Sequence, residues 1–264
     1  MSFSGYLALY WEFLIQRFKI LLEYQVNFLI GVASTFFLQA TGLLAIWIVM
    51  RQVPLLAGWS FNQILLIYGL VTIASSINQL FADNLWIVGS VYIRTSQFDR
   101  FLVRPINPLF HLLADRFNQD GIGNLLIGLL LLIKALVALE IALTPLKLLY
   151  LIVAILSGGA IFIGLNLLTA VSAFWVIDSV PVTRAIFETH TFAKYPLSIY
   201  GRGITLLMTW LIPYGFTSFY PASYLLGRDV GLLAWGGPLA AVTLLLIGYY
   251  AWQFGMRHYS STGS

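Results

Sequence analysis

The hydrophobic residues of this chain fall into long runs that are almost free of charge, and short polar segments separate these runs. The clearest runs cover residues 26–50, 61–81, 122–139, 148–175 and 232–252. At 1.5 Å per residue, a helix of roughly 20 residues crosses the hydrocarbon core of a bilayer, which is about 30 Å thick. The pattern therefore predicts an all-α integral membrane protein whose runs are transmembrane helices.

Another apolar stretch starts near Ile204 but is interrupted by Pro213 and Gly215. Non-helical backbone at membrane depth needs protein or water around it. We therefore expect a short fifth span, followed by an extracellular re-entrant hairpin over residues 213–231 and by the sixth and last span. The residues expected to shape or line an outward gate there are Pro213, Tyr214, Phe216, Phe219, Tyr220 and Pro221.

Residues 1–25 carry too many polar side chains for a span. Glu12, Gln16, Lys19 and Glu23 are spaced four, three and four residues apart, which places them in a narrow arc of one helix. The remaining faces are aromatic and aliphatic, and such a helix lies along a membrane surface. We expect an N-terminal amphipathic interfacial helix, with a frayed first span as the alternative.

The longest polar interruption lies within residues 82–121. Ser96 followed three residues later by Asp99 is typical of a helix start, because the hydroxyl and the carboxylate can accept from free backbone N–H groups. Phe98 and Phe101 then belong to one apolar stripe of this helix, since residues three apart share a face. A first short amphipathic helix of about two turns is predicted here.

A proline elbow follows that helix. Pro105 ends it, because the residue before a proline is displaced from the α region. Asn107 and Pro108 suit the cap and the first position of a second helix. Two short helices with a rigid elbow between them indicate a docking element for another protein. The alternative is an ordinary basic loop that follows the positive-inside rule.

Composition supports a membrane protein that forms one domain, residues 1–264. Of its residues 60% are hydrophobic and 9% charged, with a mean hydropathy of +0.89, whereas soluble domains carry about 25% charged residues. The absence of cysteine excludes disulfides, thiolate metal sites and cysteine nucleophiles. The net charge of +4 is not gathered into a basic patch with aromatics, so nucleic-acid binding is not expected. No removable signal peptide is expected.

The sequence offers no catalytic site. It contains no HExxH motif, no metal-ligand cluster and no GxxxxGK[ST] phosphate loop. We therefore expect no enzyme activity and no cofactor or metal in this chain. Lys134 is the one charge inside a predicted span, and an intramembrane charge is a functional hypothesis by default. The alternative is that its aliphatic stem lets the ammonium group reach the outer surface.

The basic residues predict the orientation. With six spans and the N-terminus inside, the outside segments hold Arg51, Lys147 and Arg228, and the loops 82–121 and 178–203 are inside. The inside group is larger and comprises Arg17, Lys19, Arg94, Arg100, Arg104, Arg116, Arg184, Lys194, Arg202 and Arg257. The positive-inside rule therefore predicts that both termini lie in the cytoplasm.

Two runs of the sequence resemble a known family. YIRTSQFDRFLVRPINPLF, with DNLW before it and ADRF after it, resembles the first cytoplasmic loop of bacterial type-2 ABC (ATP-binding cassette) permeases. AKYPLSIYGRGI and IPYGFTSFYPASYLLG resemble the segment that leads through the fifth span into the extracellular hairpin of the same family. The order of surface helix, six spans, coupling loop and hairpin also matches.

The resemblance implies a multi-pass permease subunit of the bacterial inner membrane, engaged in export. It implies pairing with a second permease, like or unlike itself, and with cytoplasmic ATPase subunits that bind the ATP and Mg²⁺. In that family the loop after the second span docks as a coupling helix into a groove on the ATPase. Carried over to this sequence, the contact residues are Arg94, Phe98, Asp99, Arg100, Phe101, Arg104, Pro105 and Pro108.

Within this contact we expect Phe98 and Phe101 to be the anchors that the ATPase buries, since a few residues carry most of the energy of an interface. The three arginines are expected at the rim, where charge mainly affects association. Lys134 matches nothing in the family pattern.

Two other functions remain open: the substrate-binding membrane component of another transporter class, and a scaffold or assembly factor that transports nothing. The polar groups within the spans are few, among them Gln39, Ser75, Asn78 and Asn166. They favour an amphiphilic or hydrophobic cargo over an ion.

Overall fold

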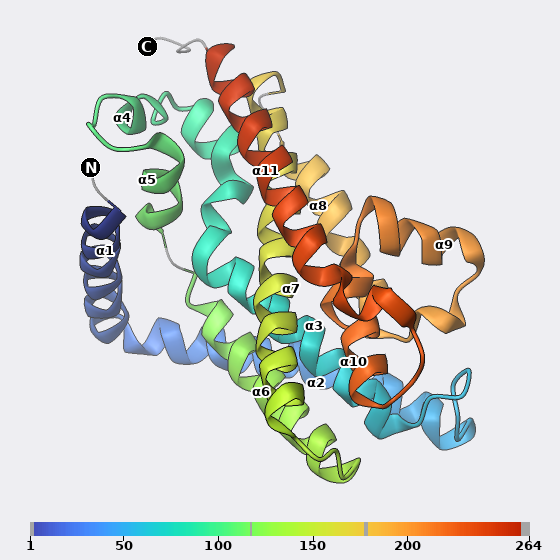
Figure 1. Ribbon diagram of the computed structural model, residues 1–264. Helices are drawn as coiled ribbons and strands as arrows, with labels where there is room; N and C mark the ends of the chain where they lie inside the picture. Colours follow the sequence, from blue (N-terminus) through green and yellow to red (C-terminus); the bar gives the residue numbers. More distant parts are fainter. Residues whose placement is uncertain (1–2, 117, 177–178, 260–264) are drawn as a thin grey trace.

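The computed structural model describes residues 3–116, 118–176 and 179–259, and no β-strand occurs within these ranges. The elements are α-helices joined by short 3-10 and π-helical turns (Figure 1). The α-helices are α1 (Phe3–Glu23), α2 (Gln25–Gln52), α3 (Phe61–Ala82), α4 (Asp99–Leu102), α5 (Pro108–Asp115), α6 (Asp120–Ala138), α7 (Pro145–Val171), α8 (Val180–Glu188), α9 (Arg202–Leu206), α10 (Phe219–Leu225) and α11 (Gly236–Arg257).

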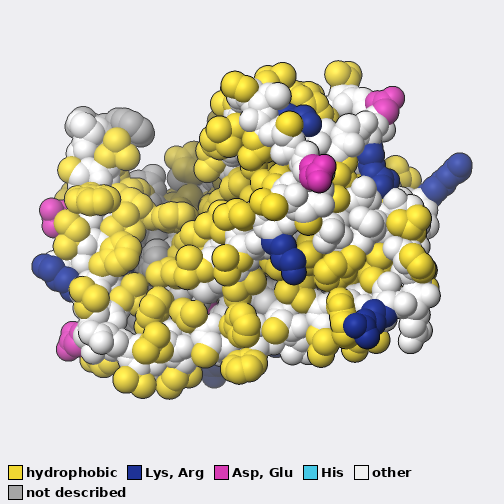
Figure 2. Space-filling view, turned by 90° about the horizontal axis from the view of Figure 1, so that it is seen from below, with side chains coloured by type: hydrophobic (Ala, Val, Ile, Leu, Met, Phe, Trp, Pro, Cys, Tyr) yellow, Lys and Arg dark blue, Asp and Glu magenta, His cyan; other side chains and the backbone are white. Residues whose placement is uncertain are grey.

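Five helical segments of the described chain are long and apolar enough to cross a membrane. They are Gln25–Gln52, Phe61–Ile93, Asp120–Ala138, Pro145–Phe174 and Gly231–Arg257. Seen from below, the molecule is covered mainly by hydrophobic side chains, and its Lys and Arg residues stand apart from one another (Figure 2). The prediction of an all-helical multi-pass membrane protein is confirmed, whereas the count of six spans is not.

The core lies along α3, which packs between α6 and α7, while α11 packs on the far side of α7 (Figure 1). Glycines allow two of these close approaches. A Cβ on Gly69 would lie 2.9 Å from the backbone nitrogen of Leu132 in α6, and a Cβ on Gly164 would lie 2.7 Å from Leu244 in α11. Helices in a bilayer associate through such small residues because lipid supplies no hydrophobic drive between them.

The bundle has two ends, which we name from their elements. One end holds the loop with α4 and α5, and both described chain termini lie there (Figure 1). The opposite end holds the turn at residues 53–60, where the guanidinium of Arg228 donates to the carbonyl of Gly58 at 2.8 Å. The ammonium of Lys147, at the start of α7, donates to the carbonyl of Leu225 at 3.4 Å. The loop after α10 therefore lies at the opposite end.

The segment from α8 to residue 199 runs along α3 between these ends. Phe187 packs against Trp86 near the end of α3, with 5.0 Å between the ring centroids. Farther along, the hydroxyl of Ser198 accepts from the indole N–H of Trp59 at 3.1 Å. These contacts correct the expectation that residues 178–203 form one loop at the α4–α5 end. Residue 178 itself lies outside the described residues.

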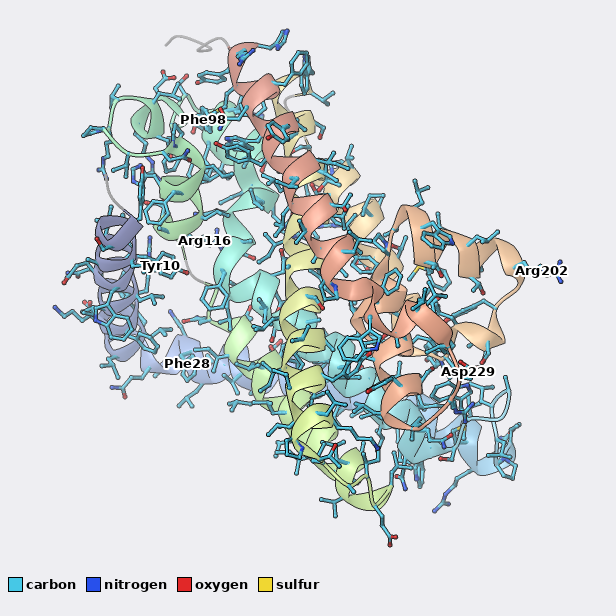
Figure 3. All side chains as sticks on the ribbon, viewed as in Figure 1. Tyr10, Phe28, Phe98, Arg116, Arg202 and Asp229 are labelled. Carbon is cyan, nitrogen blue, oxygen red and sulfur yellow. The ribbon has the colours of Figure 1, made fainter. Side chains whose placement is uncertain are left out.

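The expectation was wrong because it rested on the basic residues of this segment alone, which are typical of a loop. The ammonium of Lys194 lies 5.0 Å from the centroid of the Tyr68 ring, so an aromatic face holds the cation along the bundle. Arg202 projects from the edge of the molecule remote from α1 (Figure 3). Without these two residues the positive-inside count keeps its sign, with eight basic residues against three.

The predicted fifth span is too short. α9 and the π-helical turn Leu207–Leu211 together hold ten residues, which span about 15 Å. The chain then turns at Pro213 and returns through the 3-10 turn Tyr214–Thr217 and α10. The hydroxyls of Thr209 and Tyr220 join the two arms at 2.7 Å. The hairpin therefore starts at Arg202, earlier than the expected residue 213.

The N-terminal helix is separate from the first span. Tyr24 breaks the chain between α1 and α2, with φ −108° and ψ 49°, and α1 stands at an angle to α2 beside α5 (Figure 1). The expected amphipathic helix over residues 1–25 thus matches α1 in extent, while its place at a membrane surface stays a prediction.

Candidate functional site

The loop between the second and third spans has the predicted elbow and a different first helix. Asn107 caps α5 as expected, since its side chain accepts from the backbone N–H of Phe110 at 3.1 Å and Pro108 occupies the first turn. The first helix is only α4, which begins at Asp99. Ser96 is not its cap, because Ser96 has a φ of +56° and lies in a left-handed turn.

The two phenylalanines of this loop point into the protein. Phe98 and Phe101 are both 0% exposed. The Phe98 ring packs against Phe174 at the end of α7, Trp252 of α11 and Tyr259, with centroid distances of 5.6, 6.0 and 4.9 Å (Figure 3). The prediction that these rings are anchors buried by a partner is therefore wrong: apolar rings gain most where they leave water, and the chain itself covers them.

The exposed apolar residues of the loop lie beside those rings. Leu102 is 44% exposed and Val103 is 81% exposed, and Arg104 and Pro105 are also exposed. We call residues 102–105 the tip. The sequence analysis placed weight on the aromatic stripe and passed over Val103, although its place directly before Arg104 and the proline elbow could be seen in the sequence.

Arg100 fastens the loop and is not a free rim charge. Its guanidinium forms a 2.6 Å ion pair with Asp115 of α5 and lies 4.8 Å from the centroid of the Phe101 ring. Asp99 accepts from the hydroxyl of Tyr259 at 2.8 Å. α4 is thus tied to α5 and to the residue that follows α11, while Arg94 remains exposed.

His111 lies under the tip. Its ring is 1% exposed, and its Nε2 lies 3.0 Å from Nη1 of Arg104. Guanidinium only donates, so Nε2 accepts and the neutral imidazole carries its proton on Nδ1. Burial and then the charge of Arg104 lower the pKa of His111 from its ordinary value. The sequence analysis did not single out this histidine, because only the fold brings it against Arg104.

α1 grips the second helix of the loop. The backbone N–H of Asn107 donates to the hydroxyl of Tyr6 at 3.2 Å, and the Tyr6 ring packs edge-on against Phe110 at 4.7 Å. Arg17 also approaches Asp115 at 4.0 Å. A displacement of the loop would therefore disturb its contacts with α1 as well as those with α7 and α11.

The predicted gate residues lie inside the chain and face different neighbours. Tyr214 packs against Phe162 of α7 at a centroid distance of 4.5 Å, and Phe219 packs against Trp59 at 5.6 Å. α11 passes so close to Phe216 that a side chain on Gly236 would collide with that ring. The remaining three of the set, Pro213, Tyr220 and Pro221, are buried as well. A gate at the hairpin stays a prediction.

A chain of polar side chains crosses the middle of the bundle. The hydroxyl of Tyr68 donates to Gln39 at 2.6 Å, Gln39 donates to Asn124 at 2.8 Å, and Asn124 donates to Gln79 at 2.7 Å. The ammonium of Lys194 lies 3.5 Å from the Tyr68 hydroxyl. These bonds hold α2 to α3 and α6, because a polar group in lipid is costly without a partner.

Lys134 stands on the outside of α6. Its side chain is exposed and forms no ion pair with any described residue. It borders a groove between α2 and α6.

Comparison with known families gives one finding. A family model described as "ABC-2 family transporter protein" matches residues 36–263. No curated protein and no solved structure matches the chain.

Proposed function

The chain belongs to the ABC-2 family of transporter proteins, and on this premise we propose that it is the permease subunit of an ATP-driven exporter whose ATPase is a separate chain. The absence of a phosphate loop from the sequence supports this division of labour. ATP and Mg²⁺ would then be bound by the partner. A second permease subunit would complete the transport path.

The tip is the surface that docks on the ATPase. Val103 lies at its centre and has no cover within the chain. An exposed apolar side chain such as Val103 or Leu102 gains by burial against a partner, because its surface leaves water. Arg104, the next residue, is exposed and supplies charge at the rim, and Arg94 is an exposed basic residue of the same loop. This single observation, an uncovered apolar tip on a tightly held loop, carries the proposal.

The aromatic rings behind the tip transmit its movement. Phe98 contacts the end of α7 and α11, and Asp115 is paired with Arg100 and approached by Arg17 of α1. Packed interiors resist compression and pass displacement on to their neighbours. Movement of the ATPase would therefore reach the ends of three helices at once.

The proposed topology has six crossings. Residues 180–199 form the additional one, which is the fifth in chain order. This segment contacts Trp86 through Phe187 and Trp59 through Ser198, so it reaches from one end of α3 to the other. The protein would then lie in the inner membrane of a bacterial cell. Its hairpin 202–231 would lie at the outer side, and both termini would lie in the cytoplasm. The bond of Tyr259 to Asp99 and that of Tyr6 to Asn107 support placing both termini beside the coupling loop.

The cargo is proposed to be amphiphilic or hydrophobic. Within the bundle the polar groups bond mainly to one another, as Asn166 does to Asn78 at 3.2 Å, and the exposed faces of α2 and α11 are apolar. Such walls suit a molecule that moves along or within the lipid better than a hydrated ion.

The test is co-purification of the full chain with its ATPase in mild detergent, followed by measurement of ATP hydrolysis. Val103→Asp should release the ATPase and remove the stimulation of hydrolysis while the protein still inserts and stays folded. Val53→Asp is the matched control, because Val53 is also an exposed valine but lies at the opposite end. Retention of the ATPase by Val103→Asp would exclude the tip as the docking surface. Failure of the wild type to bind any ATPase would exclude the proposed function.

A further inference from the structure

A wedge-shaped groove opens between α2 and α6, with the start of α3 as its floor. α2 and α6 touch where a Cβ on Gly123 would meet Thr35 at 3.3 Å, and the bond from Gln39 to Asn124 follows. Beyond that point the two helices leave a space of about 380 Å³. The groove extends from Gln39 to Trp47, about 12 Å along α2, towards the end opposite α4 and α5.

The walls of the groove are apolar and nothing in the described chain covers them. They comprise Phe36, Ala40, Leu43, Leu44 and Trp47 of α2, Phe61 and Leu65 of α3, and Ile127, Leu130 and Leu131 of α6. Leu130 is 66% exposed. A space of this volume and lining is typical of a site for a small apolar ligand.

Two cations mark the open end of the groove. Lys134 lies on its rim, one turn before the end of α6, and forms no ion pair with a described residue. The nearest acid in sequence, Glu140, forms none either. Arg51 lies over the Trp47 ring, 4.1 Å from its centroid. An acidic headgroup at this end would complement both charges.

We propose that this groove binds one acidic phospholipid, with an acyl chain between α2 and α6 and the phosphate against Lys134. The apolar walls favour the acyl chain because it fills the space between the helices and gains dispersion contacts there. The two cations, which form no ion pair with a described residue, select a net negative headgroup, since a zwitterionic lipid would bring its own ammonium towards them.

A second copy of the protein is a poorer occupant of the same groove. An apolar helix seated between α2 and α6 would cover Lys134 and leave an ammonium group without a counter-ion in a low-dielectric interface, which is costly. The aliphatic stem of Lys134 also lets the ammonium reach the headgroup region while the rest of the residue lines the groove.

The bound lipid would join two helices that the protein itself joins at one end only. α2 has few buried residues, namely Thr35, Gln39 and Ile46, so its outer half would gain contacts from what fills the wedge. The site goes beyond the proposed transport function and does not require it.

The test is native mass spectrometry of the full chain, with its partners, released from nanodiscs of equal parts phosphatidylglycerol and phosphatidylcholine. The wild type should retain phosphatidylglycerol in preference to phosphatidylcholine. Lys134→Gln should reduce that preference about fivefold, the factor expected for one basic side chain at an anionic lipid. Lys147→Gln is the control, because Lys147 lies at the same end but donates to the carbonyl of Leu225.

A second variant tests the acyl chain separately from the headgroup. Ala40→Phe fills the groove from α2 and should lower the retention of both lipids. An unchanged preference in Lys134→Gln, or unchanged retention in Ala40→Phe, would overturn the proposal. Loss of dimer mass in Ala40→Phe, with lipid retention unchanged, would assign the groove to a second copy. Because neither ATPase nor cargo enters the readout, a negative result here leaves the ATPase co-purification test of the transport function standing.

Discussion

The coupling loop (residues 94–116) and the hairpin (residues 202–231) are built from the same parts and differ in what their tips touch. Both are short helices broken by proline, and most of their aromatic rings point inward, although Trp210 of the hairpin is 70% exposed. The tip of the coupling loop has no cover, whereas the hairpin is fastened by Arg228, which lies 3.9 Å from the centroid of the Trp59 ring and donates to Gly58. One segment ends in an exposed surface, and the other is fastened to its own chain.

The difference teaches how to interpret aromatic residues beside prolines. Buried rings such as Phe98 and Tyr214 set the position of a segment, and they do so equally well in both regions. In our proposal the docking surface is instead the exposed apolar residue of the tip, Val103. Four predictions test this contrast, in order of decreasing effect.

The largest effect is expected from removing the rings behind the tip. Phe98→Ala and Phe101→Ala should each lower stability by about 3–5 kcal/mol, the usual cost of a large cavity in a core. The double variant should lose less stability than the sum of the two single losses, since the centroids of the two rings lie 5.9 Å apart. Thermal unfolding of the double variant in detergent measures this. The stability of Val103→Ala should stay within about 0.5 kcal/mol of wild type. Equal melting temperatures for the wild type, the double variant and Val103→Ala would contradict the contrast between ring and tip.

Detaching the hairpin should have the next largest effect. Arg228→Gln loses the contact with the Trp59 ring and charged bonds to Gly58 and Gln63. The cost should be about 2 kcal/mol, because hydrogen bonds to a charged group contribute about 1.5–3 kcal/mol. Hydrogen exchange of residues 219–231 should rise. Arg202→Gln, at an exposed site on the same hairpin, is the control, and a rise of similar size there would show that Arg228 is not the fastening.

The fold class and the elements of the loop could be predicted from the sequence because they depend on local patterns. Long apolar runs define the spans, and Asn107 with Pro108 defines the start of α5, since both signals act within a few residues. The same local patterns misplaced Lys194, because a lysine against an aromatic face looks like a loop lysine until Tyr68 is beside it.

The elbow of the coupling loop was predicted from the sequence, but the surroundings of its aromatic rings were not. The sequence shows that Phe98 and Phe101 share a face, but it does not show whether that face meets a partner or the ends of α7 and α11. That choice depends on residues such as Trp252, far away in the chain. The scattered polar residues Gln39 and Asn124 likewise become a bonded pair only through the packing of α2 on α6.

A smaller effect is expected from the bond that joins the two arms of the hairpin. Thr209→Val keeps the shape of the side chain and removes the hydroxyl that bonds to Tyr220. The cost should be about 1 kcal/mol, the typical net value of one hydrogen bond. A double-mutant cycle with Tyr220→Phe measures the coupling, which should account for most of the loss. Purely additive effects would show that the arms are held by packing alone.

The smallest effect on stability is expected from lowering the pH. It comes from protonation of His111, which lies in the coupling loop. Because burial and Arg104 lower the pKa of His111 in the folded protein, the unfolded chain binds a proton first as the pH falls below about 6.5. Stability is therefore complete above that pH and declines below it, down to the folded-state pKa. At pH 6 the loss from this one group should be less than about 1 kcal/mol.

The measurement is thermal stability between pH 7.5 and pH 5 for the wild type, His111→Phe and His258→Phe. His111→Phe should flatten part of the acid slope, because the protein no longer has a group that binds its proton only after unfolding. His258→Phe is the control for replacing a histidine by phenylalanine at an exposed position. Arg104→Gln should shift the onset of uptake by folded His111 to higher pH, since it removes a cause of the lowered pKa. Identical slopes in the wild type and His111→Phe would mean that protonation of His111 does not contribute to the acid dependence of stability. The contact of Arg104 with the imidazole would then have no effect on proton binding.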